Sequence, residues 1–263
     1  MGRSEASRPP AGGVTGVEPL DRRRRIEIEF WRDSPTERPE SNAVENVVNK
    51  AGDAAIFLDC LRQYGPLFAR SGTILELGAG QGWASCIAKR VAPQARVIAT
   101  DISPFAVASA HKWERIFEAR LDGATACPSD AIDAPDASVD LVFCFAAAHH
   151  FVAHRRTLLE VRRVLRNGGS CLYLYEPSCP APLHALARRR VNRRRPEVPE
   201  DVLVPSRIAA IAAEVGLTCE VTPYPSVRHR RPFETLYYAL LAALPPLQRV
   251  LPCTAHYHFR KPA

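Results

Sequence analysis

The residues with the clearest chemical content lie between Ile74 and Trp83, where the chain reads Ile-Leu-Glu-Leu-Gly-Ala-Gly-Gln-Gly-Trp. An apolar run that ends in glycines at alternate positions is typical of a strand that turns into a helix. Such glycines, here Gly78, Gly80 and Gly82, let a ligand approach backbone amides near a helix N-terminus. A dinucleotide fingerprint requires glycine where Trp83 stands, so the spacing indicates a nucleotide-like ligand and disfavours NAD.

Two acidic residues follow near the ends of later strands. Asp101 comes 21 residues after Gly80, at the end of an expected strand 96–100. Its two carboxylate oxygens match the two hydroxyl donors of a ribose, with a helix N-cap as the alternative role. Asp130 precedes Ala131 in a loop, nine residues before Val139.

In this register the residues resemble those of class I S-adenosylmethionine (SAM) dependent methyltransferases, specifically small-molecule enzymes that are methyltransferase type 11-like. The resemblance covers about residues 73–174 by motif and the remainder by element order. It implies SAM as cofactor and S-adenosylhomocysteine as product, with Asp130 at the adenine amino group, Glu76 oriented toward the SAM amino group, and Gly78 and Gly80 along the methionine part. The cofactor-binding set that it implies is Glu76, Gly78, Ala79, Gly80, Gly82, Trp83, Asp101, Ile102, Asp130, Ala131 and Phe145.

Methyl transfer from a sulfonium needs alignment of the reacting atoms, exclusion of water, and a base where the acceptor carries a proton. Bases are expected at the carboxyl ends of strands, so the catalytic candidates are His149, His150 and Glu176. Similar methyltransferases use a His-His turn here to shape the pocket wall or cap a helix, and a turn role is the alternative for Glu176. The spacing of His150 and His154 suits zinc on one helix face, but the sequence offers no third ligand, so no metal is expected.

Acceptor-binding residues are expected from the remaining segments. Residues 30–42 mix aromatic and polar side chains, which we interpret as a lid with Trp31 as apolar cover and Arg38 available to a carboxylate; a surface loop is the alternative. The arginines of 188–195 form either a wall for an anionic acceptor or a solvated helix. The candidate substrate-binding residues are Trp31, Arg38, His150, Tyr175 and Arg188.

Short apolar runs alternate with helical stretches from Thr73 onward, which predicts a parallel sheet with crossover helices. The expected fold class is α/β, a Rossmann-like, mostly parallel sheet of seven strands with helices on both faces and an N-terminal helical cap. The resemblance implies an antiparallel last strand. We expect a disordered tail at 1–25, a helical cap or lid at 26–70 that Gly65-Pro66 interrupts, and a SAM-binding domain at 71–263 with an acceptor-side insertion at about 177–205. The apolar residues of 233–241 are expected to pack against the sheet, or else to wall a pocket.

Composition narrows the class of protein. With 263 residues and 46% hydrophobic content, the chain suits one enzyme-sized unit. Its eight cysteines form no Cys-x-x-Cys pair, which predicts a reduced, cytoplasmic protein. No apolar run reaches the ~18 residues that a membrane span requires, and no signal-peptide core is present. Clusters at 188–195 and 228–231 account for the net charge of +7.

The sequence therefore predicts methylation of a small-molecule acceptor, anionic in one interpretation, in secondary or specialised metabolism. Oxygen is the expected methylated atom only by family precedent. An RNA or protein methyltransferase using the arginine clusters is the first alternative, disfavoured because Cys144-Phe145-Ala146-Ala147 stands where an Asn-Pro-Pro-Tyr-like motif would be. A non-catalytic SAM-fold binding protein is the second. Acceptor, base and oligomeric state stay open.

Overall fold

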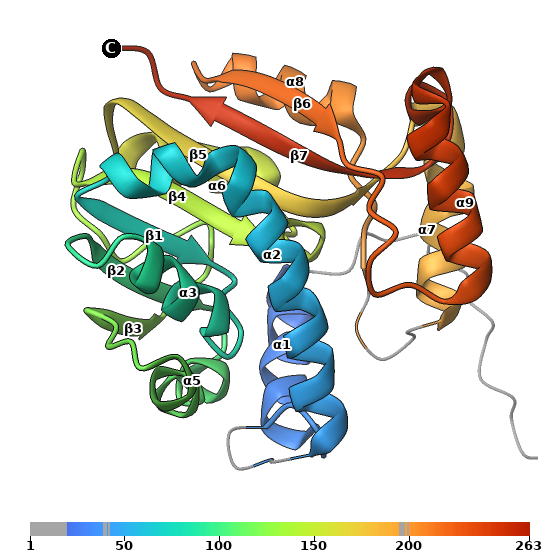
Figure 1. The fold of residues 1–263 in the computed structure, drawn as a ribbon. Coiled ribbons are helices and arrows are strands. Elements are labelled where there is room, and N and C mark those ends of the chain that lie inside the picture. The colour runs from blue at the N-terminus through green and yellow to red at the C-terminus, as the bar shows by residue number, and fades with distance from the viewer. Residues whose placement is uncertain (1–19, 39–40, 42, 195–197, 199) are drawn as a thin grey trace, which may run out of the picture.

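The computed structural model describes residues 20–38, 41, 43–194, 198 and 200–263 (Figure 1). A seven-stranded sheet with the order β3-β2-β1-β4-β5-β7-β6 forms its centre. β7 pairs antiparallel with both β5 and β6, and the other neighbouring strands are parallel. The expected fold class is confirmed, including the antiparallel last strand. The strands are β1 (Thr73–Leu77), β2 (Arg96–Asp101), β3 (Gly123–Ala126), β4 (Val139–Phe145), β5 (Leu165–Ser178), β6 (Thr218–Pro223) and β7 (Cys253–Arg260).

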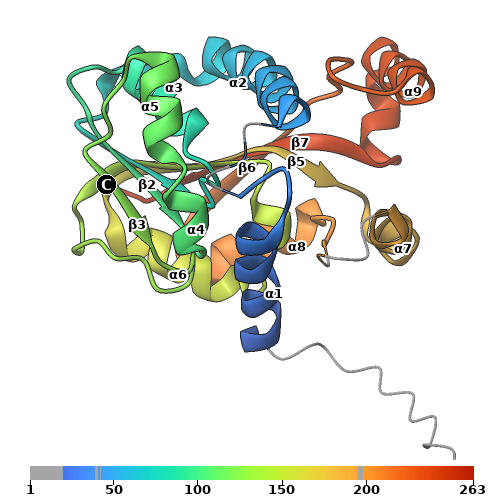
Figure 2. The same cartoon turned by 90° about the horizontal axis from the view of Figure 1, so that it is seen from below.

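Helices cover both faces of the sheet, as Figure 2 shows. On one face, Phe57 of α2, Trp83 of α3 and Trp113 of α5 share a core with the strands. On the other face, Leu158 of α6 and Ile208 of α8 belong to a second core. The α-helices are α1 (Leu20–Asp33), α2 (Val44–Arg70), α3 (Trp83–Val91), α4 (Pro104–Val107), α5 (Ala110–Phe117), α6 (His154–Val164), α7 (His184–Arg194), α8 (Pro205–Glu214) and α9 (Pro232–Ala243); the 3-10 helices are η1 (Ala148–His150), η2 (Ala181–Leu183) and η3 (Pro245–Arg249).

Helix α1 begins earlier than the sequence predicts. Residues 20–25, assigned to the tail 1–25, form its first turns, and residues 1–19 lie outside the described residues. Arg24 reaches Asp130 across the fold, with 2.5 Å between Nη2 and Oδ1. Periodicity of apolar residues does not reveal such a helix, because charged contacts hold this part of it.

Helix α2 continues to Arg70 through Gly65 and Pro66, the pair that predicts an interruption. The ring of Phe68 is fully buried and lies 5.2 Å from that of Phe143 and 6.1 Å from that of Phe57. A proline inside a helix costs about 3 kcal/mol, while burying one large apolar side chain gains about 1.5–3 kcal/mol. Packing of the last turn on the sheet thus offsets most of the local penalty.

The prediction that the apolar residues of 233–241 pack against the sheet is wrong for Phe233, Leu236 and Leu240. Phe233 and Leu236 of α9 are 89% and 71% exposed, and Leu240 is 46% exposed, whereas Leu241 is buried. The two sheet faces are already covered by the other helices, and α9 lies beyond the amino-terminal end of β7 (Figure 1). Within the described part of the chain, no helix has both the length and the apolar character to cross a bilayer.

Candidate active site

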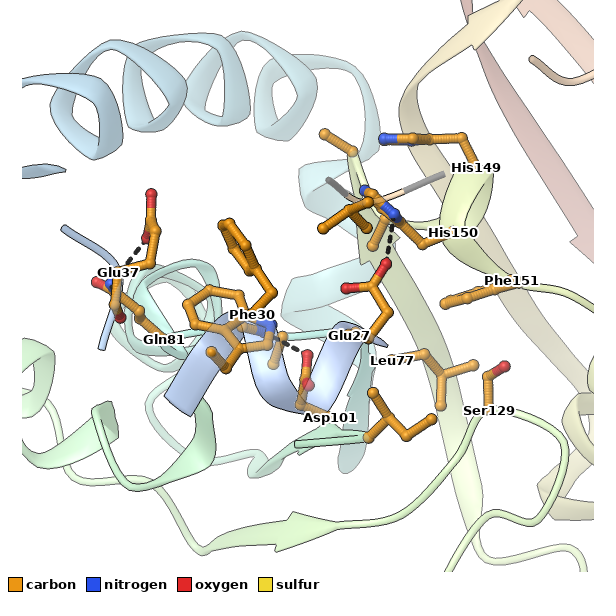
Figure 3. Close-up of a pocket in the computed structure, with 18 of the residues that line it drawn as sticks. Glu27, Phe30, Glu37, Leu77, Gln81, Asp101, Ser129, His149, His150 and Phe151 are labelled. Carbon is orange, nitrogen blue, oxygen red and sulfur yellow. Dashed lines mark hydrogen bonds and ion pairs between the residues drawn. The ribbon is translucent and has the colours of Figure 1, made fainter. Parts of the chain in front are cut away.

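A cavity of about 940 Å³ opens at the carboxyl ends of β1, β2 and β4, under α1. It brings together twelve of the residues that the sequence analysis proposed for the site: Trp31, Glu76, Gly78, Ala79, Gly80, Trp83, Asp101, Ile102, Asp130, Phe145, His149 and His150. Figure 3 shows several of them, with Phe30 of α1 projecting into the same space. The proposed residues that do not line it are Arg38, Gly82, Ala131, Tyr175, Glu176 and Arg188.

The glycine turn after β1 has backbone angles that side chains disfavour. Gly78, Gly80 and Gly82 have φ values of 64°, 53° and 77°, all in the left-handed region. Space is also restricted, because a Cβ on Gly78 would lie 2.9 Å from the Cβ of Ala147. Gly82 is the N-cap of α3, so it starts the helix while the two earlier glycines face the cavity.

Asp101 fixes the second glycine of this turn. Its Oδ2 accepts a hydrogen bond from the Gly80 amide at 2.9 Å, and its Oδ1 accepts one from the Ser103 amide at 2.9 Å. Burial raises the pKa of Asp101 to about 6, although both amide hydrogen bonds oppose the shift. The N-cap of α4 is Ser103, so the alternative N-cap role of Asp101 does not apply.

Glu76 lies in β1 directly below the turn and is 2% exposed. The Ser85 hydroxyl of α3 donates a hydrogen bond to its Oε2. Burial raises the pKa of Glu76 to about 8 despite this hydrogen bond. A cation that reaches Glu76 would therefore meet a carboxyl group that is poised to release a proton near neutral pH.

Helix α1 and the turn after it form the outer wall of the cavity. The Trp31 ring lies over the turn, since a Cβ on Gly80 would be 3.1 Å from it. Glu27 contacts His150, with 2.7 Å between Oε1 and Nδ1, and Glu37 accepts a hydrogen bond from the Gln81 amide group at 3.0 Å (Figure 3). The sequence did not indicate Arg24 and Glu27, because nothing local shows that residues 20–29 return to the strand ends. Glu37 lies in the segment interpreted as a lid and Gln81 in the glycine turn, but neither was proposed as a site residue.

His149 and Glu176 form a buried pair beside the cavity. β5 shifts register between Tyr173 and Glu176, with Tyr175 at φ 58°, and this places the Glu176 side chain against the end of β4. Its carboxylate accepts hydrogen bonds from the amides of Ala147, Ala148 and His149 at 2.8–3.1 Å. His149 Nδ1 lies 2.9 Å from its Oε2.

The electrostatics of Glu176 follow from these contacts. Full burial would raise the pKa of Glu176, but His149 and the backbone amides outweigh it and hold the pKa below its usual value. Glu176 does not reach the cavity, so it can act on a ligand only through His149.

The second histidine also meets a carboxylate. Burial would lower the pKa of His150, but Glu27, with smaller contributions from Glu200 and Glu176, raises it. His154 starts α6 whereas His150 ends η1, so the two do not share a helix face as their spacing suggested. Instead Glu200, from the expected insertion, comes close to His149 and His150, and potential ligand atoms of the three residues lie within 4.8 Å of one another. Sequence spacing could not reveal Glu200, which is 50 residues from His150.

The other acceptor candidates lie away from the cavity. Arg38 is exposed, and Arg188 is exposed on α7. Tyr175 does not line the cavity but stacks on Phe145, which does, with ring centroids 5.6 Å apart. Arg195 and the side chain of Arg194 lie outside the described residues. The described arginines of α7 therefore do not wall this cavity.

The charge of the lining is mostly negative. Three Arg or Lys side chains, Arg23, Arg24 and Lys50, face seven carboxyl groups, those of Glu27, Glu37, Asp53, Glu76, Asp101, Asp130 and Glu200. Even with some carboxyl groups protonated, this lining favours a ligand with positive charge.

Residues 75–173 match a family model described as a methyltransferase domain. The comparison with curated proteins gives no match. Among solved structures, the fold is similar to geranyl diphosphate C-methyltransferase from Streptomyces coelicolor A3(2), with a TM-score of 0.65 and 11% identity over 92% of this chain and 100% of that one. It is also similar to phosphoethanolamine N-methyltransferase 2 of Haemonchus contortus (TM-score 0.57, 18% identity, 90% of this chain and 57% of that one). The YcgJ protein of Bacillus subtilis shares the fold as well (TM-score 0.56, 17% identity, 81% and 99%).

Proposed function

We propose that this class I SAM-dependent methyltransferase moves the methyl group of SAM to an oxygen atom of a small-molecule acceptor. The observation that supports the proposal is a single cavity lined by the glycine turn, by Asp101 and Asp130, and by the paired histidines. Groups that suit SAM binding and groups that can accept a proton thus lie together at the carboxyl ends of adjacent strands, where α/β sheets bind ligands.

In this proposal the cofactor lies across the glycine turn. The ribose hydroxyls meet Asp101, the adenine lies between Ile102 and Asp130, and the methionine part follows Gly78 and Gly80. Glu76 faces the amino group. SAM carries a sulfonium and an ammonium against one carboxylate, and this net positive charge suits the acidic lining.

His149 is the group that we assign to the acceptor oxygen. Since Nδ1 lies against Glu176, Nε2 is the nitrogen left for a ligand. A neutral imidazole in this tautomer accepts the hydroxyl proton as the oxygen attacks the methyl carbon. A C–O bond forms, the C–S bond breaks, and its electron pair stays on sulfur, which gives neutral S-adenosylhomocysteine. The Glu176 carboxylate stabilises the imidazolium that results.

The acceptor class follows from the lining beside the histidines. Phe30, Phe151 and Val198 supply apolar surface, while the described arginines of α7 do not take part. A hydroxylated, partly apolar molecule without net negative charge fits better than the anionic acceptor considered from sequence. Nucleic acid fits poorly for the same electrostatic reason.

Two measurements on the full chain test this proposal. Calorimetry should detect SAM binding that Asp101→Asn weakens and that Asp136→Asn, an exposed and distant carboxylate control, leaves unchanged. Transfer of labelled methyl groups from SAM to a panel of phenols, alcohols and isoprenoid alcohols should then identify the acceptor class. Absence of SAM binding would contradict the proposal and favour a non-catalytic protein. Methylation of RNA that weakens as salt is added would show that the acceptor is a nucleic acid and not a small molecule.

A further inference from the structure

We infer that His149, His150 and Glu200 form a binding site for one divalent transition-metal ion beside the methyl-donor site. All three residues line the main cavity, and their potential ligand atoms lie within 4.8 Å of one another. Two imidazoles and one carboxylate are a ligand set that Zn²⁺ and Fe²⁺ both use in catalytic sites with an open position. Ligand atoms around such an ion lie about 3.5 Å from one another. Side-chain movements of about 1 Å would therefore bring the three ligand atoms to bonding distance of one ion.

The orientation of His149 supports this assignment independently of the distances. A ligating histidine usually donates its other ring N–H to a carboxylate, which fixes the tautomer and strengthens the ligand. Glu176 occupies this place, 2.9 Å from Nδ1, and three backbone amides hold it there. The Nε2 lone pair of His149 is therefore directed by a rigid, fully buried partner.

His150 also has a carboxylate beside its ring, but without the hydrogen-bond geometry that joins His149 to Glu176. Its Nδ1 lies 2.7 Å from Oε1 of Glu27 (Figure 3). The two imidazole rings lie close together, with centroids 4.2 Å apart. With Nδ1 of His149 hydrogen-bonded to Glu176 and Nδ1 of His150 facing Glu27, the two Nε2 atoms are the nitrogens that we assign to one shared ion.

Charge also favours a cation at this position. Glu200 is 8% exposed, and its carboxylate, like that of Glu27, lies close to the histidines. Together with Glu176, three carboxylates thus surround two imidazoles. A divalent ion would lower the electrostatic cost of holding these carboxylates together in a partly dry site.

The ligand types indicate which ion binds. Imidazole nitrogens suit Zn²⁺, Fe²⁺, Co²⁺ or Ni²⁺, whereas Mg²⁺ prefers oxygen ligands and retains its water. The role of the ion rests on the proposed function: it would bind the acceptor oxygen, so that the hydroxyl proton leaves to water before the oxygen attacks the methyl carbon. The ion would then replace His149 as the group that activates the acceptor.

The test uses the full chain without a histidine tag, stripped of metal by a chelator that is then removed. Titration with Zn²⁺ in a calorimeter should give one ion per chain, with affinity at least about tenfold weaker in His149→Ala, His150→Ala and Glu200→Gln. His111→Ala, an exposed histidine on α5, is the matched control and should bind as the parent does. Mg²⁺ should show much weaker binding.

The outcomes separate the metal site from the proposed function. Stoichiometric Zn²⁺ binding that the three ligand variants do not weaken would overturn the site, as would the absence of binding. Methyl transfer that proceeds unchanged in metal-free protein would remove the role of the ion while leaving the proposed function, with His149 as the base, intact. Zn²⁺ binding at these residues without methyl transfer to any acceptor would leave the site and overturn the proposed function.

Discussion

The Nδ1 atom of His149 lies 2.9 Å from Oε2 of Glu176, and the carboxylate of that pair also accepts three backbone hydrogen bonds from the turn after β4. The turn and the imidazole are thus held by the same buried group. Any ligand that binds His149 is oriented by a residue that it never touches.

Replacement of Glu176 should therefore affect chemistry more than cofactor binding. Glu176→Gln keeps the volume and one carbonyl oxygen but loses the charge that holds His149. We expect kcat for methyl transfer to fall about 10–100-fold with the KM for SAM nearly constant, and Zn²⁺ affinity to fall by a similar factor. Steady-state kinetics and calorimetry measure both.

The matched control is Glu220→Gln, which removes an exposed carboxylate paired with Arg260. It should change neither quantity. A Glu176→Gln protein with normal melting temperature, kcat and metal affinity would show that Glu176 only stabilises the turn.

The glycine turn allows a test of the cofactor cradle. Gly80→Ala adds a Cβ at φ 53° and 3.1 Å from the Trp31 ring. A left-handed residue with a side chain costs about 1–2 kcal/mol, so the melting temperature should fall and SAM affinity should drop at least about tenfold. Gly65→Ala, in α2 and away from the residues that line the cavity, should keep SAM affinity. No gain in stability is expected from it, because Pro66 disfavours the helical conformation of a preceding residue that carries a Cβ. Equal SAM affinities in the two variants would contradict a cofactor role for the turn.

Sequence patterns predict the residues at the strand ends of this site better than those of the segments that lie over them. Gly78, Gly80 and Asp101 could be placed because a strand ending in glycines, followed by an acidic residue on the next strand, obeys local geometry. The structure does gather these positions, with Asp130 and the two histidines, around one cavity.

What the sequence did not predict depends on contacts between distant segments. Glu27 and Glu200 approach the histidines from α1 and from the insertion, and no periodicity in either segment specifies that approach. Phe233 has the composition of a core residue yet lies 89% exposed, because composition does not say which sheet face is still uncovered. The arginines of α7 were equally ambiguous, and only the fold shows that the described ones lie outside the cavity.

Trp31 should control how long the cofactor stays bound. Its ring covers the glycine turn from α1, so Trp31→Ala opens the cavity without removing a polar contact to SAM. We expect the dissociation rate of SAM to rise about tenfold with a smaller change in association rate, as is usual when contacts around a bound ligand are lost. Stopped-flow or surface plasmon resonance measures both rates. Phe233→Ala, an exposed aromatic outside the cavity, is the control, and identical rates in the two variants would contradict a lid.

The two buried carboxyl groups predict how stability and cofactor binding depend on pH. Burial raises the pKa of Glu76 to about 8 and of Asp101 to about 6, both above the values expected in the unfolded chain. Between about pH 4.5 and pH 8 the ligand-free protein thus binds more protons than its unfolded chain at these groups, and they destabilise it as pH rises. The melting temperature measured without SAM should therefore fall over this range, and Glu76→Gln should reduce the fall.

SAM should have the opposite dependence, because its positive charges favour the ionised form of Glu76. Binding then releases a proton, and affinity should rise by up to about tenfold per pH unit between pH 6.5 and pH 7.5. Calorimetry in buffers of different ionisation enthalpy measures the proton release directly. Glu76→Gln should flatten this pH dependence, and comparison with the parent chain cancels the titration of SAM itself. An equally steep dependence in both proteins would show that Glu76 does not face the amino group of the cofactor.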